Sequence, residues 1–62
     1  MKKIIKILME RDGLTEQEAK DMVQDVKEMV EHSIAQGDYE EAEEIFLSEL
    51  GLEIDYMVNL LL

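Results

Sequence analysis

The sequence predicts an all-α fold, a small bundle of three main helices followed by a short C-terminal one. Three observations support this. The 62 residues include no proline, the three glycines each follow a helix-like run, and apolar residues between them recur in steps of three and four. No segment shows the alternation typical of a strand. The spacing predicts helices over about residues 2–11, 15–36, 39–50 and 54–61, in a single domain covering 1–62.

The first predicted helix carries one apolar stripe, and a glycine follows it. Gly13 is suited to the left-handed C′ position that ends many helices. Met9 and Leu14 then take the positions whose apolar contact accompanies a Schellman ending. The stripe consists of Ile4, Ile5, Leu8 and Met9.

The second predicted helix has the strongest start signal in the chain. Thr15 and Glu18 have the spacing of a capping box, in which each side chain accepts a hydrogen bond from the backbone of the other residue. Glu16 and Lys20 form a favourably oriented i,i+4 pair. The helical stripe that follows is Ala19, Met22, Val23, Val26, Met29, Val30 and Ile34.

The third and fourth predicted helices lie on either side of Gly51. Asp38 is the expected N-cap of the third helix, with Glu41 as its capping-box partner. The fourth helix is expected to present one stripe of Ile54, Met57, Val58 and Leu61. Because chain ends fray unless they dock, the terminal run of three leucines indicates packing against the core or a second subunit. Its candidate oligomer-interface residues are Met57, Val58, Leu61 and Leu62.

Size and composition favour a protein that gains support by self-association. A chain this short buries only about 60% of its unfolded surface, and without cysteine it has neither disulfides nor thiolate metal sites. The absence of cysteine suits a cytoplasmic location. No apolar run approaches the roughly 20 residues of a membrane span. We therefore expect a cytoplasmic homodimer with no cofactor and no membrane contact.

The charge of the chain is divided unequally along its length. All six basic residues lie within positions 1–27, where six acidic residues balance them, whereas positions 28–62 hold ten acidic residues and no basic one. A DNA-reading helix needs Lys or Arg for phosphates and base edges. The acidic balance therefore opposes direct nucleic-acid binding.

Enzymatic chemistry finds little support in the residues. His32 is the single histidine, and Glu28 lies one helical turn before it. A catalytic or zinc site needs further converging groups. We expect a surface histidine whose charge suits a helix C-terminus, and a protein that is not an enzyme.

The most pointed local feature is the acidic cluster Glu40, Glu41, Glu43 and Glu44. Each like-charged neighbour one turn apart costs about 0.2–0.5 kcal/mol, and the helix dipole offsets part of that cost. One interpretation is a solvated face that aids solubility, and the other is a docking surface for a basic partner protein. The lysines at positions 2, 3 and 6 are candidates to lie across from this cluster within the fold.

Three phrases cover much of the chain: ERDGLTEQEA at positions 10–19, GDYEEAEEI at 37–45 and LGLEIDY at 50–56. Together they resemble the small acidic helical proteins of bacteriophages and bacterial mobile elements. The resemblance implies a bacterial or phage cytosolic setting. The small core, the apolar stripes and the terminal leucines lead to a first hypothesis, a non-enzymatic interaction or regulatory protein that forms a homodimer. The acidic charge of positions 28–62 leads to a second, an acidic inhibitor, or DNA mimic, that occupies a basic site on a host nucleic-acid-binding protein.

Overall fold

The computed structural model describes residues 2–61, and it confirms the all-α fold. The described residues form α1 (Lys2–Asp12), α2 (Glu16–Ala35), α3 (Tyr39–Leu50), a short 3-10 helix η1 (Ile54–Tyr56) and α4 (Met57–Leu61). The ends of the first two helices differ from the predicted bounds by a residue. Thr15 and Gln36 cap α2 and do not belong to it.

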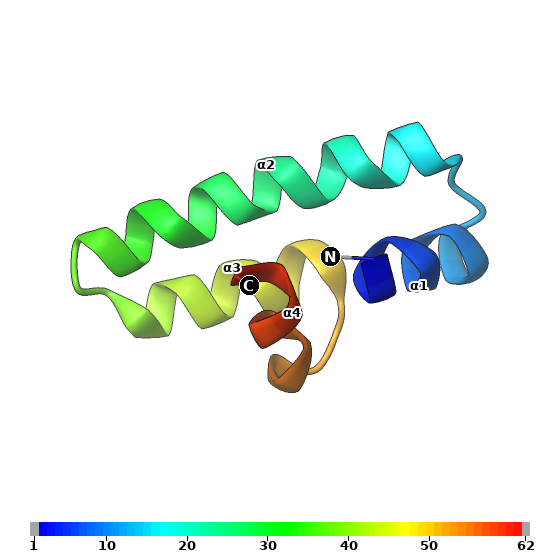
Figure 1. Cartoon of the computed structure of the whole chain (residues 1–62). Coiled ribbons are helices and arrows are strands. Elements are labelled where there is room, and N and C mark those ends of the chain that lie inside the picture. Colours follow the sequence, from blue (N-terminus) through cyan, green and yellow to red (C-terminus); the bar gives the residue numbers. More distant parts are fainter. Residues whose placement is uncertain (1, 62) are drawn as a thin grey trace.

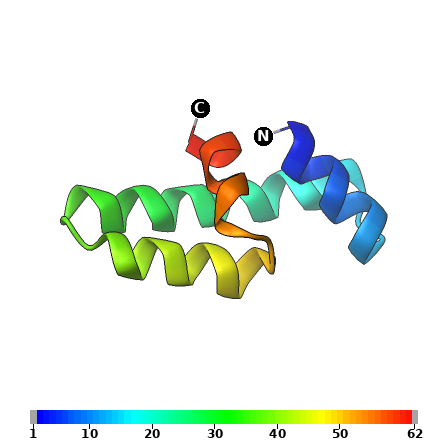
Figure 2. The ribbon, with the colours of Figure 1, turned by 90° about the horizontal axis from the view of Figure 1, so that it is seen from below.

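The helices α2 and α3 form an antiparallel hairpin that runs the length of the molecule (Figure 1). The chain measures 33 Å along this axis and 18 Å across it. Figure 2 shows α4 on one side of the hairpin, with α1 crossing α2 at one end. The N-terminal part of α1 comes close to α4, so the two described chain ends lie on the same face.

The core lies where the apolar rows of the helices meet. A row from α2 packs against one from α3, and α1 and α4 cover the remaining side. Each row has the helical spacing expected from the sequence. The buried apolar residues are Ile4, Leu8, Ala19, Val23, Val26, Val30, Ala42, Phe46, Leu50, Leu52 and Leu60.

Both predicted contacts at the start of α2 are confirmed. The Glu18 amide donates to the Thr15 hydroxyl at 3.1 Å, and the Thr15 amide donates to the Glu18 carboxylate at 3.0 Å. Lys20 and Glu16 form the expected ion pair at 2.9 Å. Local signals in the sequence therefore predicted this helix start.

The helix endings differ in type from the prediction. At Gly13 the amide donates to the Met9 carbonyl, which is the simpler αL pattern and not the expected Schellman pattern. The Schellman pattern occurs after α2, where Gly37 donates to Ile34 and Asp38 donates to Ser33. There the chain reverses within two residues, and the φ of +80° at Gly37 suits glycine.

The end of α3 is tied to α1 by an arginine. The Arg11 guanidinium donates to the Leu50 carbonyl at 2.8 Å and to the Gly51 carbonyl at 3.2 Å, and it also pairs with Asp12 at 2.8 Å. These carbonyls have no partner within the helix, and a cation beside them is favoured by the helix dipole. Arg11 therefore joins the end of α3 to α1 through residues 39 and 40 positions away in the sequence.

Candidate functional site

The acidic cluster occupies the first two turns of α3, at the end of the molecule farthest from α1 (Figure 1). Asp38 is the N-cap, and its carboxylate accepts from the Glu41 amide at 3.1 Å. The prediction of Asp38 as the cap is confirmed. The reciprocal half of the expected capping box is absent, because the Glu41 carboxylate accepts instead from the Ser33 hydroxyl at 3.3 Å.

The four glutamates of this cluster divide into two pairs. Glu41 faces α2 through Ser33, a residue that is only 3% exposed. Glu41 and Glu44 line a shallow hollow on this flank of α3 together with Ile45. By helical spacing, Glu40 and Glu43 lie toward the other flank. The sequence predicted that all four glutamates lie on one helix, but not that they lie on two different flanks of it.

The expectation that the α1 lysines balance this acidic cluster is wrong. The start of α3 lies at one end of the hairpin and α1 at the other (Figure 1). Lys3 lies over the ring of Tyr56 instead, 5.6 Å from its centroid. Within residues 2–61 the ion pairs are Arg11–Asp12 and Lys20–Glu16, so the glutamates at the start of α3 have no cationic partner there.

The short helix α4 exposes part of the apolar surface expected at an oligomer interface. Val58 is 60% exposed and Leu61 38% exposed, whereas Met57 is half-buried against the core. The predicted stripe is wrong in one respect. Leu60, which the stripe leaves out, is fully buried and is the residue of α4 that enters the core. Leu62 lies outside the described residues.

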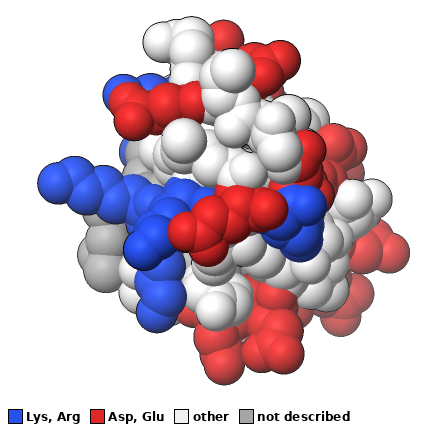
Figure 3. All heavy atoms as spheres, turned by 90° about the vertical axis from the view of Figure 1, so that its right-hand side faces the viewer, with Lys and Arg blue, Asp and Glu red and all other residues white. Residues whose placement is uncertain are grey.

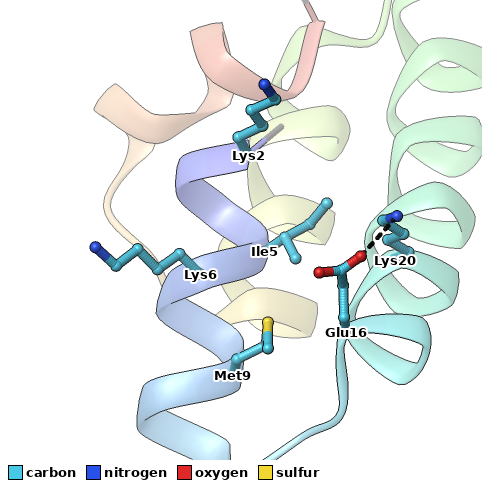
Figure 4. Close-up of a pocket in the computed structure, with 6 residues that line it drawn as sticks. All are labelled: Lys2, Ile5, Lys6, Met9, Glu16 and Lys20. Atoms are coloured by element: carbon cyan, nitrogen blue, oxygen red, sulfur yellow. Dashed lines mark ion pairs between the residues drawn. The ribbon is translucent and has the colours of Figure 1, made fainter.

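A groove between α1 and α2 was not found by sequence reasoning. Figure 4 shows Ile5 directed from α1 toward α2, with Lys2 and Lys6 extending outward from α1. The groove is lined by Lys2, Ile5, Lys6, Met9, Glu16 and Lys20. Lys20 is paired with Glu16, so Lys2 and Lys6 provide the uncompensated charge. Ile5 and Met9 belong to the predicted apolar stripe of α1, and both are half-buried in the structure.

Most of the basic side chains that Figure 3 shows lie on the side of the molecule that carries α4. Figure 3 views the α1 end along the long axis, and the lysine and arginine side chains gather mainly on the left of that view. This side faces the reader in Figure 1, where α4 lies in front of α3. The molecule therefore has a cationic region beside α4 and an acidic region beyond it along the same axis.

The single histidine lies on the outer surface of α2. His32 contacts the Gln36 side-chain amide at 3.0 Å, and it lines an open hollow with Asp25, Glu28 and Met29. Across residues 2–61 no group of three or more His, Cys, Asp or Glu is placed to hold a metal ion. In the same range, no helix is both long and apolar enough to cross a membrane.

Two carboxylates have pKa values below their usual range. Hydrogen bonds from the Thr15 backbone amide, and then from its side chain, lower the pKa of Glu18. A hydrogen bond from the Arg11 side chain lowers the pKa of Asp12. Both residues act at helix ends, so these shifts report local folding contacts and not a reactive site.

Comparison with known proteins gives no relative for this chain: no family model, no curated protein and no solved structure matches it. The resemblance to small acidic proteins of bacteriophages and mobile elements stays a prediction. Function is therefore inferred from the surfaces described above.

Proposed function

We propose that this chain is a small non-enzymatic interaction protein that forms a homodimer through the face carrying α4. The observation that carries the proposal is the exposure of Val58 and Leu61 on a helix that Leu60 fixes to the core. The apolar pair is thereby held in a defined position on the surface.

Two further exposed apolar residues support self-association. Leu47 is 45% exposed and Tyr39 is 61% exposed, both on α3. They lie two turns apart, so they share a face of that helix. Single exposed apolar residues are ordinary, but several on one side of a small protein mark an interaction surface. A chain of 62 residues also gains stability when a partner covers apolar area.

No described surface gathers the nucleophile, base and orienting group that a reaction requires. Lys20 and Asp12 are each engaged in an ion pair. We propose accordingly that the protein acts by binding. The cytoplasmic and phage-like setting belongs to the same proposal and rests on the acidic, cysteine-free sequence.

Sedimentation equilibrium at micromolar concentration tests the proposal. The wild-type chain is expected to have twice the 7.2 kDa mass of the monomer, and Val58→Asp is expected to return the mass to that of the monomer. Met29→Asp is the matched control, because Met29 is an exposed apolar residue on the outer surface of α2, 40% exposed. A wild-type monomer throughout this range contradicts the proposal.

A second candidate function is an acidic inhibitor that occupies a basic site on a nucleic-acid-binding protein. The observation favouring it is that Glu40, Glu43 and Glu44 are exposed and lack a cationic partner among residues 2–61. Such binding should weaken strongly with salt. Changing these three residues to Gln should abolish it and leave the Glu41–Ser33 contact in place. Binding that persists in this variant or at high salt counts against the inhibitor.

A further inference from the structure

One long face of the molecule carries three surfaces that the fold itself does not use. The exposed apolar residues of α4 lie near the middle of the long axis (Figure 1). The groove with Lys2 and Lys6 lies toward the α1 end. The start of α3, with Glu40 and Glu43, lies toward the opposite end.

The flank of α3 that bears Glu43 faces the same side as α4. The buried row of α3 has α2 on one side, as the contact between Glu41 and Ser33 shows. The segment with η1 and α4 borders the other side (Figure 2). Glu43 and Leu47 lie on the flank away from Glu41. They therefore turn toward the side that carries α4 and the lysine groove.

The size of the molecule decides how much of this face a partner must cover. A stable protein interface buries about 800 Å² on each partner, and the whole described surface is 4203 Å². One long face spans only 33 by 18 Å between Cα atoms. A dimer of ordinary interface size therefore takes up most of the face, including both of its ends.

Because the interface covers both charged ends of the face, the charges decide the relative direction of the two copies. If the copies lay parallel, the acidic start of α3 in one would meet the same residues in the other. If they lay antiparallel, each acidic region would meet a lysine groove. Like-charge contact in an interface is strongly unfavourable, while complementary charge fixes the register of the partners.

We propose that a second copy of this chain docks antiparallel on this face, with Lys2 and Lys6 of each copy beside Glu40 and Glu43 of the other. The proposal rests on the self-association proposed above and adds its geometry. A two-fold axis perpendicular to the long axis passes near α4, so Val58 and Leu61 of the two copies meet at the centre. The contact is self-complementary and closed, as in most homodimers.

The parts of this interface have different roles. Exposed ion pairs contribute little each, so the apolar centre supplies most of the affinity. The charged ends select the antiparallel direction. At physiological salt the Debye length is about 8 Å, so contacts at the ends matter more than the net charge of −10 on each copy.

A charge-exchange experiment tests the arrangement. One chain carries Lys2→Glu and Lys6→Glu, and the other carries Glu40→Lys and Glu43→Lys. Each alone should weaken its dimer about tenfold or more, because two like-charged contacts replace two complementary ones. A mixture should form a one-to-one heterodimer, in which both contacts are complementary again, measured by native mass spectrometry at about physiological salt.

The matched control changes charge by the same amount on the outer surface of α2. Asp25→Lys with Glu28→Lys should leave the affinity of the dimer unchanged, since both residues line the open hollow beside His32. Circular dichroism verifies helix content, and Glu40→Gln with Glu43→Gln replaces any lysine variant that fails to fold, with an intermediate loss of affinity expected.

The outcomes separate this arrangement from the proposed function. If the wild-type chain dimerises and neither charge exchange weakens the dimer, the antiparallel arrangement is overturned and self-association stands. Loss of dimers without recovery in the mixture also overturns it. A wild-type chain that is monomeric at all concentrations overturns both proposals.

Discussion

The two ends of α3 are stabilised by charged groups of opposite sign. They differ in how many of their charged side chains make contacts within the fold. At its C-terminus the Arg11 guanidinium donates to the carbonyls of Leu50 and Gly51. At its N-terminus Asp38 accepts from the Glu41 amide. Both arrangements match the helix dipole. The C-terminal end has the single cation that it uses, whereas the N-terminal end has more carboxylates than the fold uses.

The second candidate function and the antiparallel arrangement depend on the carboxylates at the N-terminal end of α3 that the fold does not use. Asp38 and Glu41 have hydrogen-bond partners that explain them. Glu40, Glu43 and Glu44 are exposed, and no cation pairs with them in residues 2–61. Substitutions at the two ends should therefore differ in size and, for some residues, in sign.

The largest effect is expected at the C-terminal end of α3. Arg11→Ala removes the contacts to both carbonyls and should lower the free energy of unfolding by about 1–2 kcal/mol, reduced from the usual value for charged hydrogen bonds because the side chain is partly exposed. Urea denaturation measures the change. Glu10→Ala is the control on the same helix and should change stability little, since Glu10 is exposed. Equal losses in both variants would show that Arg11 has no special role.

At the N-terminal end, Asp38→Ala should cost about 1 kcal/mol, because the Glu41 amide then loses its acceptor. Thermal unfolding followed by circular dichroism measures this. Asp38→Ser should recover most of the loss, since serine also caps helices well. If serine gave no recovery, the side-chain cap would not be the source of the stability.

The capping box of α2 should contribute a pH-dependent stability. The folded pKa of Glu18 is lowered by the Thr15 hydrogen bonds, so its contribution is complete above the unfolded pKa and is lost as pH falls through the folded one. The difference in melting temperature between wild type and Glu18→Ala should therefore be largest near pH 7 and shrink below pH 4.5, the ordinary value for this group. A difference that is constant across this range contradicts the linkage.

The smallest effect on stability is expected for the exposed glutamates at the start of α3, where a substitution should stabilise the protein. Glu44→Gln should stabilise the monomer by about 0.2–0.5 kcal/mol, because it removes repulsion from Glu40 one turn away, and the dipole is weak beyond the first turn. Glu40→Gln should be nearly neutral, since the relief of repulsion and the loss of the dipole interaction oppose each other. Urea denaturation of both variants at low salt makes the comparison.

Local signals in the sequence predicted the fold well. The capping box at Thr15 and the glycine after each of the first three helices depend on neighbours within a few residues, so the bounds of these three helices could be predicted to within a residue. The fourth predicted helix is a 3-10 helix over its first three residues. The partners of Arg11 and Glu41 could not be predicted, since both lie on another helix. Nothing in the sequence alone shows which helices meet.

For the candidate surfaces too, features that depend on nearby residues were predicted, and features that depend on how the helices pack were not. Val58 and Leu61 were predicted as surface for a partner and are exposed, but the burial of Leu60 in the core was not predicted. The lysine groove needs the crossing of α1 over α2 and so has no local signal. The prediction that lysines face the acidic cluster failed because α1 packs at the opposite end (Figure 1).

Cross-linking at the centre of the proposed face tests the account most directly. The chain has no cysteine, so Val58→Cys introduces a single thiol near the expected two-fold axis, and Met29→Cys introduces one on the outer surface of α2. Mild oxidation at micromolar concentration should convert Val58→Cys into a disulfide-linked dimer much faster than Met29→Cys, as seen on a non-reducing gel. Equal rates for the two variants, or faster linkage at position 29, would contradict the proposal that the face carrying α4 joins two copies.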